Sequence, residues 1–190
     1  DPEASILLTL GNPRTPTKLQ IRDIHFSIMF NDFFYKKLVE DGEIFTFNVY
    51  TAPDLQEAFF KTDGSFEKLY EAYENNKDFK KNYIKARDIA DIYMIQCQEV
   101  ATTYCANISE INRHTPHLDV IYSSNLCLEI TQPTKGYNKI TDLYKEEGED
   151  LGEISLCSLA GIVVSKIESE KEYEDVSYYA LKMIDKCIDL

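Results

Sequence analysis

The sequence has few of the residues that interrupt regular structure. Only seven glycines and six prolines occur among its 190 residues. Hydrophobic residues make up 44% of the chain and charged residues 28%, which excludes the compositions of disordered and fibrous proteins. The length is enough for one ordinary domain. We therefore expect one soluble α/β or α+β body with a packed core.

Positive charge is also scarce. Lysine and arginine number 20 against 33 aspartates and glutamates, so the formal net charge is −13. A field of this sign repels phosphate backbones, which argues against a general nucleic-acid-binding protein. It does not exclude a nucleotide site, because a few local donors can hold one phosphate group.

Histidines are few, and no two cysteines have the close spacing of a metal site. The three histidines and five cysteines include no C-x-x-C pair, so we expect no bound metal. An odd number of cysteines that do not form a dense disulfide pattern is typical of a reducing compartment. The most apolar segment, residues 154–167, is too short to span a membrane and is interrupted by serines and a lysine. No signal peptide is visible, so we expect a cytoplasmic protein without membrane contact.

Hydrophobic periodicity predicts strands that alternate with helices, a pattern typical of parallel α/β units. The clearest helical stripe runs from about Ile84 to Val100. We expect strands at residues 5–10, 24–29, 44–49, 104–108 and 154–164, an extended segment at 120–130, a polar loop at 112–117, and helices at 32–40, 65–75, 84–100 and 173–190, with one more beginning near Asp54.

One short segment combines three chemically useful side chains. In an extended backbone, residues i and i+2 point the same way, so Asn125, Cys127 and Glu129 would share one side. They would present an amide, a redox-active thiol and a carboxylate base to a hydroxylated substrate. The alternative is a surface strand with a chance cysteine, since this triplet should occur by accident in about one chain per hundred of this size.

The other cysteines have more ordinary settings. Cys97 and Cys187 lie on apolar helical stripes and are predicted to be small core residues. Cys105 has no clear context and is predicted to be structural. Cys157 lies in an apolar run, which by itself indicates another core cysteine. The three histidines show no metal-ligand spacing and are expected to be structural or exposed.

Four segments together resemble a known family. Residues 124–130, with Pro133-Thr134 close behind, resemble the finger-loop segment of class I ribonucleotide reductase large subunits. Residues 152–160 resemble the next strand of that family, which carries a reducing thiol. Residues 112–116 and 66–74 resemble further segments in the right order. The sequence departs from the family pattern around Cys157, a difference that affects packing more than the thiol.

The resemblance implies a reaction and roles for these residues. In this family the ribose 2′-hydroxyl of a ribonucleotide is replaced by hydrogen. Cys127 would become a thiyl radical that takes the 3′-hydrogen, and Glu129 would accept the 3′-hydroxyl proton. Asn125 would hold the same part of the sugar, and Cys157 would be one of two thiols that end as a disulfide. Leu126 and Leu128 would complete the substrate-binding segment.

The resemblance also implies a fold. Residues 1–190 would form a single segment of a catalytic domain, a portion of a ten-stranded α/β barrel with the radical-cysteine loop in its centre. The first residue is not methionine and the last lies within a helical pattern, so we expect an internal segment of a longer chain. The effector site and ATP-binding cone would precede it, and the rest of the barrel would follow.

The cofactors and partners implied are those of the family. No cofactor would bind directly to this segment. A metal-containing small subunit would supply the radical, and ATP and deoxynucleotide effectors would bind mainly elsewhere. The partners would be a ribonucleoside diphosphate substrate, the remaining parts of the large subunit, a second large subunit in a homodimer, and thioredoxin or glutaredoxin as reductant.

Two other functions stay open. The chain could be a non-catalytic remnant that acts as an interaction module. It could instead be a thiol redox protein that uses Cys127 and Cys157 as a pair, although such pairs usually lie close in sequence and near a helix start. On the leading hypothesis the segment alone is inactive, because it lacks the second reducing thiol.

Overall fold

The computed structural model describes residues 2–145 and 151–189. The chain divides into two compact units, Asp1–Glu153 and Ile154–Leu190. Each unit is described by itself below. A domain of a longer protein can contain both units, so the expectation that residues 1–190 belong to one domain stays a prediction.

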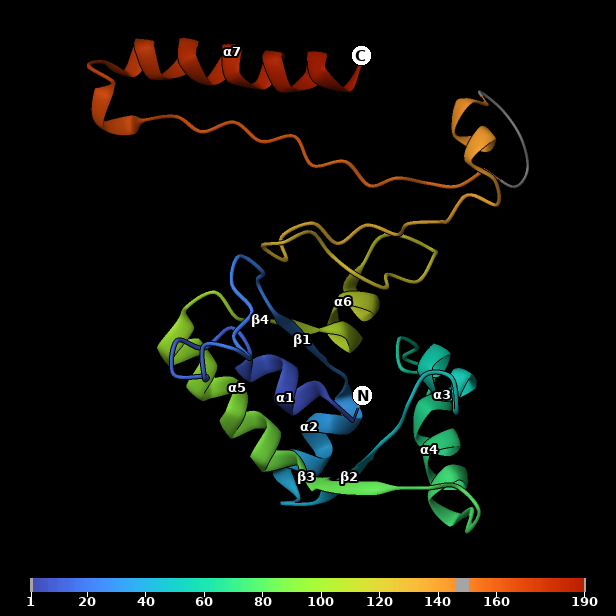
Figure 1. The fold of residues 1–190 in the computed structure, drawn as a ribbon. Helices are drawn as coiled ribbons and strands as arrows, with labels where there is room; N and C mark the ends of the chain where they lie inside the picture. The colour runs from blue at the N-terminus through green and yellow to red at the C-terminus, as the bar shows by residue number, and fades with distance from the viewer. Residues whose placement is uncertain (1, 146–150, 190) are drawn as a thin grey trace. The chain divides into compact units, whose positions relative to one another are not determined.

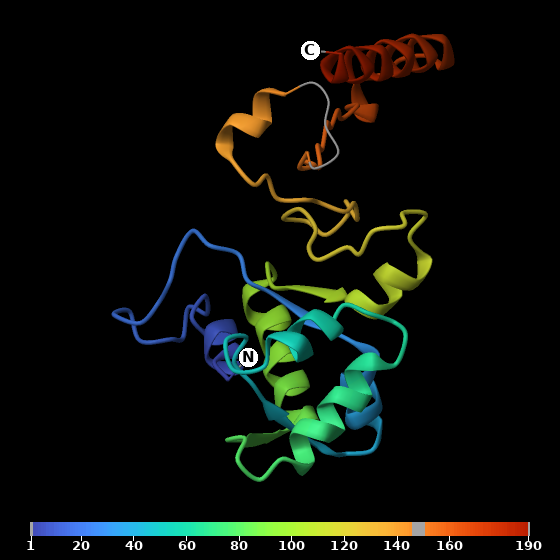
Figure 2. The same ribbon diagram turned by 90° about the vertical axis from the view of Figure 1, so that its right-hand side faces the viewer.

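The first unit contains two small sheets and most of the helices (Figures 1 and 2). Its strands are β1 (Ser27–Phe30), β2 (Glu43–Thr46), β3 (Asn82–Lys85) and β4 (Tyr104–Asn107). Its helices are α1 (Ala4–Thr9), α2 (Asp32–Val39), α3 (Pro53–Ala58), α4 (Ser65–Asn75), α5 (Ala86–Val100) and α6 (Ile108–His114), with a 3-10 turn η1 at Ile140–Tyr144.

Strands β1 and β4 form a parallel pair, as the sequence predicts. Ser27 is opposite Tyr104 and Phe30 is opposite Asn107. A helix begins directly after each strand. The backbone N–H of Phe34 donates to the side chain of Asn31 at 3.1 Å, which caps α2. The backbone N–H of Asp32 donates to the Ser109 hydroxyl at 3.0 Å, which joins the starts of α2 and α6.

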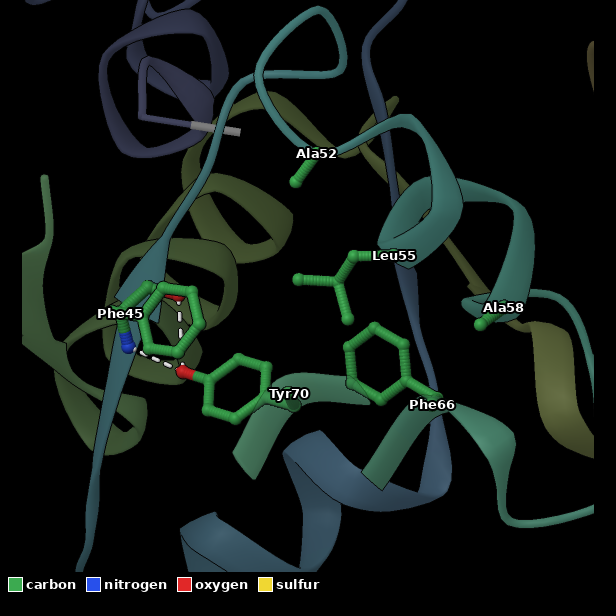
Figure 3. Close-up of a cluster of buried hydrophobic side chains, with 6 residues drawn as sticks. All are labelled: Phe45, Ala52, Leu55, Ala58, Phe66 and Tyr70. Carbon is green, nitrogen blue, oxygen red and sulfur yellow. Dashed lines mark hydrogen bonds between the residues drawn. The ribbon is translucent and has the colours of Figure 1, made fainter. Parts of the chain in front are cut away.

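Strands β2 and β3 are antiparallel, which the sequence does not predict. The cluster that includes Phe45 in β2, Leu55 in α3 and Tyr70 in α4 forms a core beside them (Figure 3). The backbone N–H of Phe45 donates to the Tyr70 hydroxyl at 2.5 Å, and that hydroxyl donates to the Phe45 carbonyl at 3.1 Å. Tyr70 therefore satisfies the polar backbone of β2 from within the core, and burial raises its pKa above the usual range.

A second cluster lies between β1 and the helices α2 and α5. The rings of Phe30 and Phe34 stack with centroids 3.9 Å apart, and Ala86 and Ile89 of α5 complete the buried group. The loop after α1 is also attached to α5. The side-chain amide of Asn12 donates to the Gln96 side chain at 2.9 Å. Both residues are at most 5% exposed, so this bond is shielded from water.

The second unit has much less structure. Its elements are a 3-10 turn η2 (Val164–Lys166) and α7 (Glu170–Ile188). Ser169 caps α7, since the backbone N–H of Glu172 donates to its hydroxyl at 3.2 Å. None of the α7 residues that the structure describes is buried. No helix in the described parts of the chain has the length and hydrophobicity needed to cross a lipid bilayer.

Several expectations about elements are wrong. Residues 154–164 form no strand, because no other strand of the described chain pairs with them. Residues 5–10 are mostly helix α1, a run too short for periodicity to separate a helix from a strand. The expected polar loop at 112–117 instead begins inside α6, which ends at His114.

Candidate functional site

The loop that contains Cys127 is a turn, not a strand. The backbone N–H of Leu128 donates to the Asn125 carbonyl at 3.2 Å, and Leu128 has a left-handed backbone with φ of 62°. The expectation that residues 120–130 are extended is therefore wrong at the cysteine. The alternation argument for a common side fails with it, since period 2 requires an extended backbone.

Side chains at the base of this turn hold it closed. The backbone N–H of Ile130 donates to Asn125 Oδ1 at 3.0 Å. Ser124 Oγ lies 2.5 Å from the Ile130 carbonyl oxygen and 3.1 Å from Asn125 Oδ1. Serine and asparagine side chains commonly bond nearby backbone groups in this way and so compete with strand formation. Residues 124 and 130 are thereby joined, and the residues between them form a closed loop, called the Cys127 loop below.

The tip of the Cys127 loop faces solvent. Cys127 is a free, exposed thiol. Glu129 is exposed, and Leu126 is 60% exposed, whereas Asn125 and Leu128 are half-buried. A thiol and a carboxylate therefore lie within one short loop whose ends are fixed. This arrangement can present a hydrogen-transfer group and a proton acceptor to one molecule.

Helix α6 anchors the segment that leads into the loop. The side chain of Asn112 donates to the Ile121 carbonyl at 2.9 Å and accepts from the Ile121 backbone N–H at 2.8 Å. Ile121 is fully buried. Sequence reasoning missed this role of Asn112. The available signal was its amide, which can bond both backbone groups of one residue at once.

Cys157 lies in the second unit. Its thiol is free and exposed, in the segment 154–164 that forms no strand. The apolar neighbours of Cys157 are exposed too, with Leu156 at 70% and Leu159 at 76%. The core position that its apolar context indicates is therefore wrong within the described chain. Cys157 and the Cys127 loop thus belong to different units.

The remaining cysteines separate by burial. Cys97 and Cys105 are half-buried, whereas Cys187 is exposed, so the core position expected for Cys187 is wrong. Burial raises the pKa of the Cys105 thiol, although a hydrogen bond from Tyr35 opposes the shift. Burial and the same thiol raise the pKa of Tyr35 to about 12. Cys105 is therefore a weak nucleophile near neutral pH, because the thiolate is the reactive form.

Charged groups elsewhere form ion pairs. Arg113 of α6 pairs with both Asp32 and Glu110, and His114 lies 3.0 Å from Glu110. Across residues 2–145 and 151–189, no three histidine, cysteine or acidic side chains gather as a metal site would require.

Comparisons with known proteins cover nearly the whole chain. It is 34% identical over 190 residues to ribonucleoside-diphosphate reductase subunit alpha of Buchnera aphidicola subsp. Acyrthosiphon pisum, which is 98% of this chain and 24% of that protein. It is 33% identical to the subunit of the same name from Haemophilus influenzae, with the same coverage. The subunit of Enterobacteria phage T4 is 26% identical over 193 residues, again 98% of this chain and 24% of that protein. The chain thus spans about a quarter of the length of these relatives.

The family model described as "Ribonucleotide reductase, barrel domain" matches residues 3–190. This match agrees with the resemblance found in the sequence and with the mixed α/β structure. The fold is a portion of the barrel of a ribonucleotide reductase alpha subunit. On this match and these identities, the chain belongs to the ribonucleotide reductase barrel-domain family.

Proposed function

We propose that this chain is the part of an alpha subunit that carries the radical cysteine for reduction of ribonucleoside diphosphates. The observation that carries the proposal is the closed Cys127 loop. It presents an exposed thiol and an exposed carboxylate, and hydrogen bonds join its two ends. The relatives named ribonucleoside-diphosphate reductase support the substrate class.

Cys127 and Glu129 have complementary roles in the proposed reaction. The Cys127 thiyl radical takes the ribose 3′-hydrogen, which forms an S–H bond and leaves a carbon radical at C3′. Glu129 accepts the 3′-hydroxyl proton as a general base. The 2′-hydroxyl accepts a proton from one of the two reducing thiols and leaves as water. C2′ then receives a hydrogen from the thiol pair, and Glu129 returns its proton to the 3′-oxygen. At the end of the cycle Cys127 returns the hydrogen to C3′ and is a thiyl radical again.

Cys157 supplies reducing equivalents in this scheme. Its thiol and a second thiol from another part of the subunit give up two electrons and two protons and become a disulfide. Exposure of Cys157 in this chain is compatible with that exchange, because a thiol must be accessible to be oxidised and reduced again. Thioredoxin or glutaredoxin would then restore the two thiols.

Asn125 would bind the sugar through its amide nitrogen. Its oxygen is already occupied by the backbone N–H of Ile130. The nitrogen is the remaining polar atom of the side chain, and it is a donor only. Asn125 would therefore donate a hydrogen bond to a ribose hydroxyl oxygen. Leu126 and Leu128 would line the same substrate-binding segment.

The proposal places this chain in a larger assembly. A separate small subunit with a metal centre supplies the radical when it is bound. ATP and deoxynucleotide effectors bind mainly outside residues 1–190, and no cofactor binds directly to them. We further propose that residues 1–190 belong to one catalytic barrel domain, that two alpha subunits form a dimer, and that the enzyme acts in the cytoplasm.

The test is Cys127→Ser in the complete alpha subunit, assayed with its small subunit for deoxyribonucleotide formation. We expect turnover to fall to background, because a serine hydroxyl does not replace a thiyl radical. Cys187→Ser is the matched control, since Cys187 is also exposed and has no role in the scheme. It should keep full activity. Clear turnover by the Cys127→Ser enzyme would refute the proposed function.

A further inference from the structure

The two serines before the Cys127 loop differ in their contacts. Ser124 is half-buried and bonds the far end of the loop. Ser123 is exposed, and its side chain makes no hydrogen bond to any residue that the structure describes. We propose that Ser124 is a positioning residue of the reductase reaction, which fixes the thiol of Cys127 and the amide of Asn125 by closing the loop. This inference rests on the proposed function.

The Ser124 hydroxyl has one proton and lies near two acceptor oxygens, of which the Ile130 carbonyl is the nearer. Its Oγ is 2.5 Å from the Ile130 carbonyl oxygen and 3.1 Å from Asn125 Oδ1. The Ile130 backbone is therefore bonded at both of its polar groups, at the carbonyl by Ser124 and at the N–H by Asn125. Removal of the Ser124 hydroxyl leaves the carbonyl side of this closure without its partner.

The same closure determines which atom of Asn125 is available. A backbone N–H can only donate, so the Asn125 atom that faces the Ile130 N–H is the oxygen. The single proton of the Ser124 hydroxyl is directed to the Ile130 carbonyl at the shorter distance, so the Ile130 N–H sets the orientation of the carboxamide. A rotated carboxamide would bring its N–H groups against the Ile130 N–H, where no acceptor exists. The Ile130 N–H thus engages the Asn125 oxygen and leaves the Asn125 nitrogen as the donor for a ligand.

The tip of the loop depends on the hydrogen bonds that join residues 124 and 125 to Ile130. Leu128 has φ of 62°, a backbone conformation that leucine rarely adopts. Such a residue stays in place only where the surrounding bonds hold it. If the hydrogen bonds to Ile130 break, Leu128 can relax to ordinary dihedral angles, and its neighbour Cys127 moves with it. Hydrogen transfer is sensitive to such movement, since a displacement of about 1 Å can lower a rate about 100-fold.

The experiment compares Ser124→Ala with Ser123→Ala in the complete alpha subunit reconstituted with its small subunit. We expect Ser124→Ala to lower kcat about 10- to 100-fold and to change KM less than about threefold. Ser123→Ala should leave both constants unchanged. Equal activity of the two variants would overturn the proposal, as would a Ser124→Ala enzyme that loses only substrate affinity.

A second pair of variants separates the hydroxyl from the shape of the side chain. Threonine and valine have the same shape, but only threonine keeps the hydroxyl. Ser124→Thr should retain kcat within about fivefold of wild type, whereas Ser124→Val should show the full loss that Ser124→Ala shows. If the two variants are equally impaired, packing and not the hydroxyl bond is responsible, and the proposal fails.

Two further measurements locate the effect. Hydrogen exchange in Ser124→Ala should speed up in the peptide that contains residues 124–130 and stay unchanged in α5, and unchanged exchange in that peptide would overturn the proposal. Cys127→Ser in the same preparation tests the proposed function separately. An inactive Cys127→Ser enzyme beside a fully active Ser124→Ala enzyme would reject only the positioning role. An active Cys127→Ser enzyme would reject the function itself.

Discussion

The two units of this chain differ in how their apolar side chains are used. In the first unit Phe45 and Leu55 are at most 2% exposed and lie in a shared core. In the second unit Leu159 is 76% exposed and Leu181 is 70% exposed. The Cys127 loop therefore belongs to a unit that has its own packed core. Cys157 lies in a segment that buries little apolar surface within its own unit, so that unit supplies little packing to hold it in place.

Shortening one leucine in each unit gives the largest contrast. Leu55→Ala should lower the free energy of unfolding of the isolated chain by about 2–5 kcal/mol, because it leaves a cavity in the core. Leu159→Ala should change it by less than about 0.5 kcal/mol, since that side chain is already in water. Urea titrations followed by circular dichroism would measure both. A Leu159→Ala loss as large as that of Leu55→Ala would contradict the comparison.

Tyr70 tests the polar part of the first unit's core. Tyr70→Phe should lower the free energy of unfolding by about 1–2 kcal/mol, because it leaves the N–H and carbonyl of Phe45 without a buried partner. The matched control is Tyr50→Phe, since Tyr50 is 94% exposed. Its effect in the same urea titration should be close to zero. Equal effects of the two changes would show that the Tyr70 bonds contribute nothing.

Alkaline pH should act on the same residue. Burial raises the pKa of Tyr70 in the folded chain, so the unfolded chain releases the phenol proton first. The stability that the neutral phenol provides is complete below the ordinary tyrosine pKa of about 10 and is lost as the pH rises above it. Unfolding midpoints measured from pH 8 to 11 should therefore decline. The decline should be smaller in Tyr70→Phe, and an unchanged slope would exclude Tyr70 as its source.

The helix caps give the smallest contrast. Asn31→Ala should lower the free energy of unfolding by about 1 kcal/mol, because α2 packs into the core of the first unit. Ser169→Ala should leave the urea midpoint unchanged and reduce only the helical circular dichroism signal, since α7 has no buried residue in its described part. A midpoint shift for Ser169→Ala would show that α7 contributes to the cooperative core.

Sequence patterns predicted an element best where the residues of that element alone determine its structure. The helix expected at 65–75 matches α4 at both ends, because its apolar face repeats at helical spacing and Tyr70 lies within it. The strand expected at 154–164 does not form, although the apolar run in this segment is longer than any in the 65–75 helix. A strand requires a neighbour, and the local sequence does not say whether a neighbouring strand lies within the described chain.

The site shows the same division. Sequence and resemblance identified Asn125, Cys127 and Glu129, and these residue assignments stay predictions about chemistry. The shape of the loop was not predicted, because leucine at position 128 gives no sign of a left-handed backbone. The bonds that impose it come from Ser124 and Asn125 to a residue that is not their sequence neighbour.

The pairing of β1 with β4 also bears on how the chain is made. Every element from α2 to α5 lies between the two strands in the sequence. Contacts between distant segments carry a large loop-closure cost and slow folding. During synthesis, β1 leaves the ribosome well before β4 exists. In that interval its backbone groups lack the only strand that pairs with them in the described structure. β1 is therefore the strand of this unit most at risk of pairing with another nascent chain.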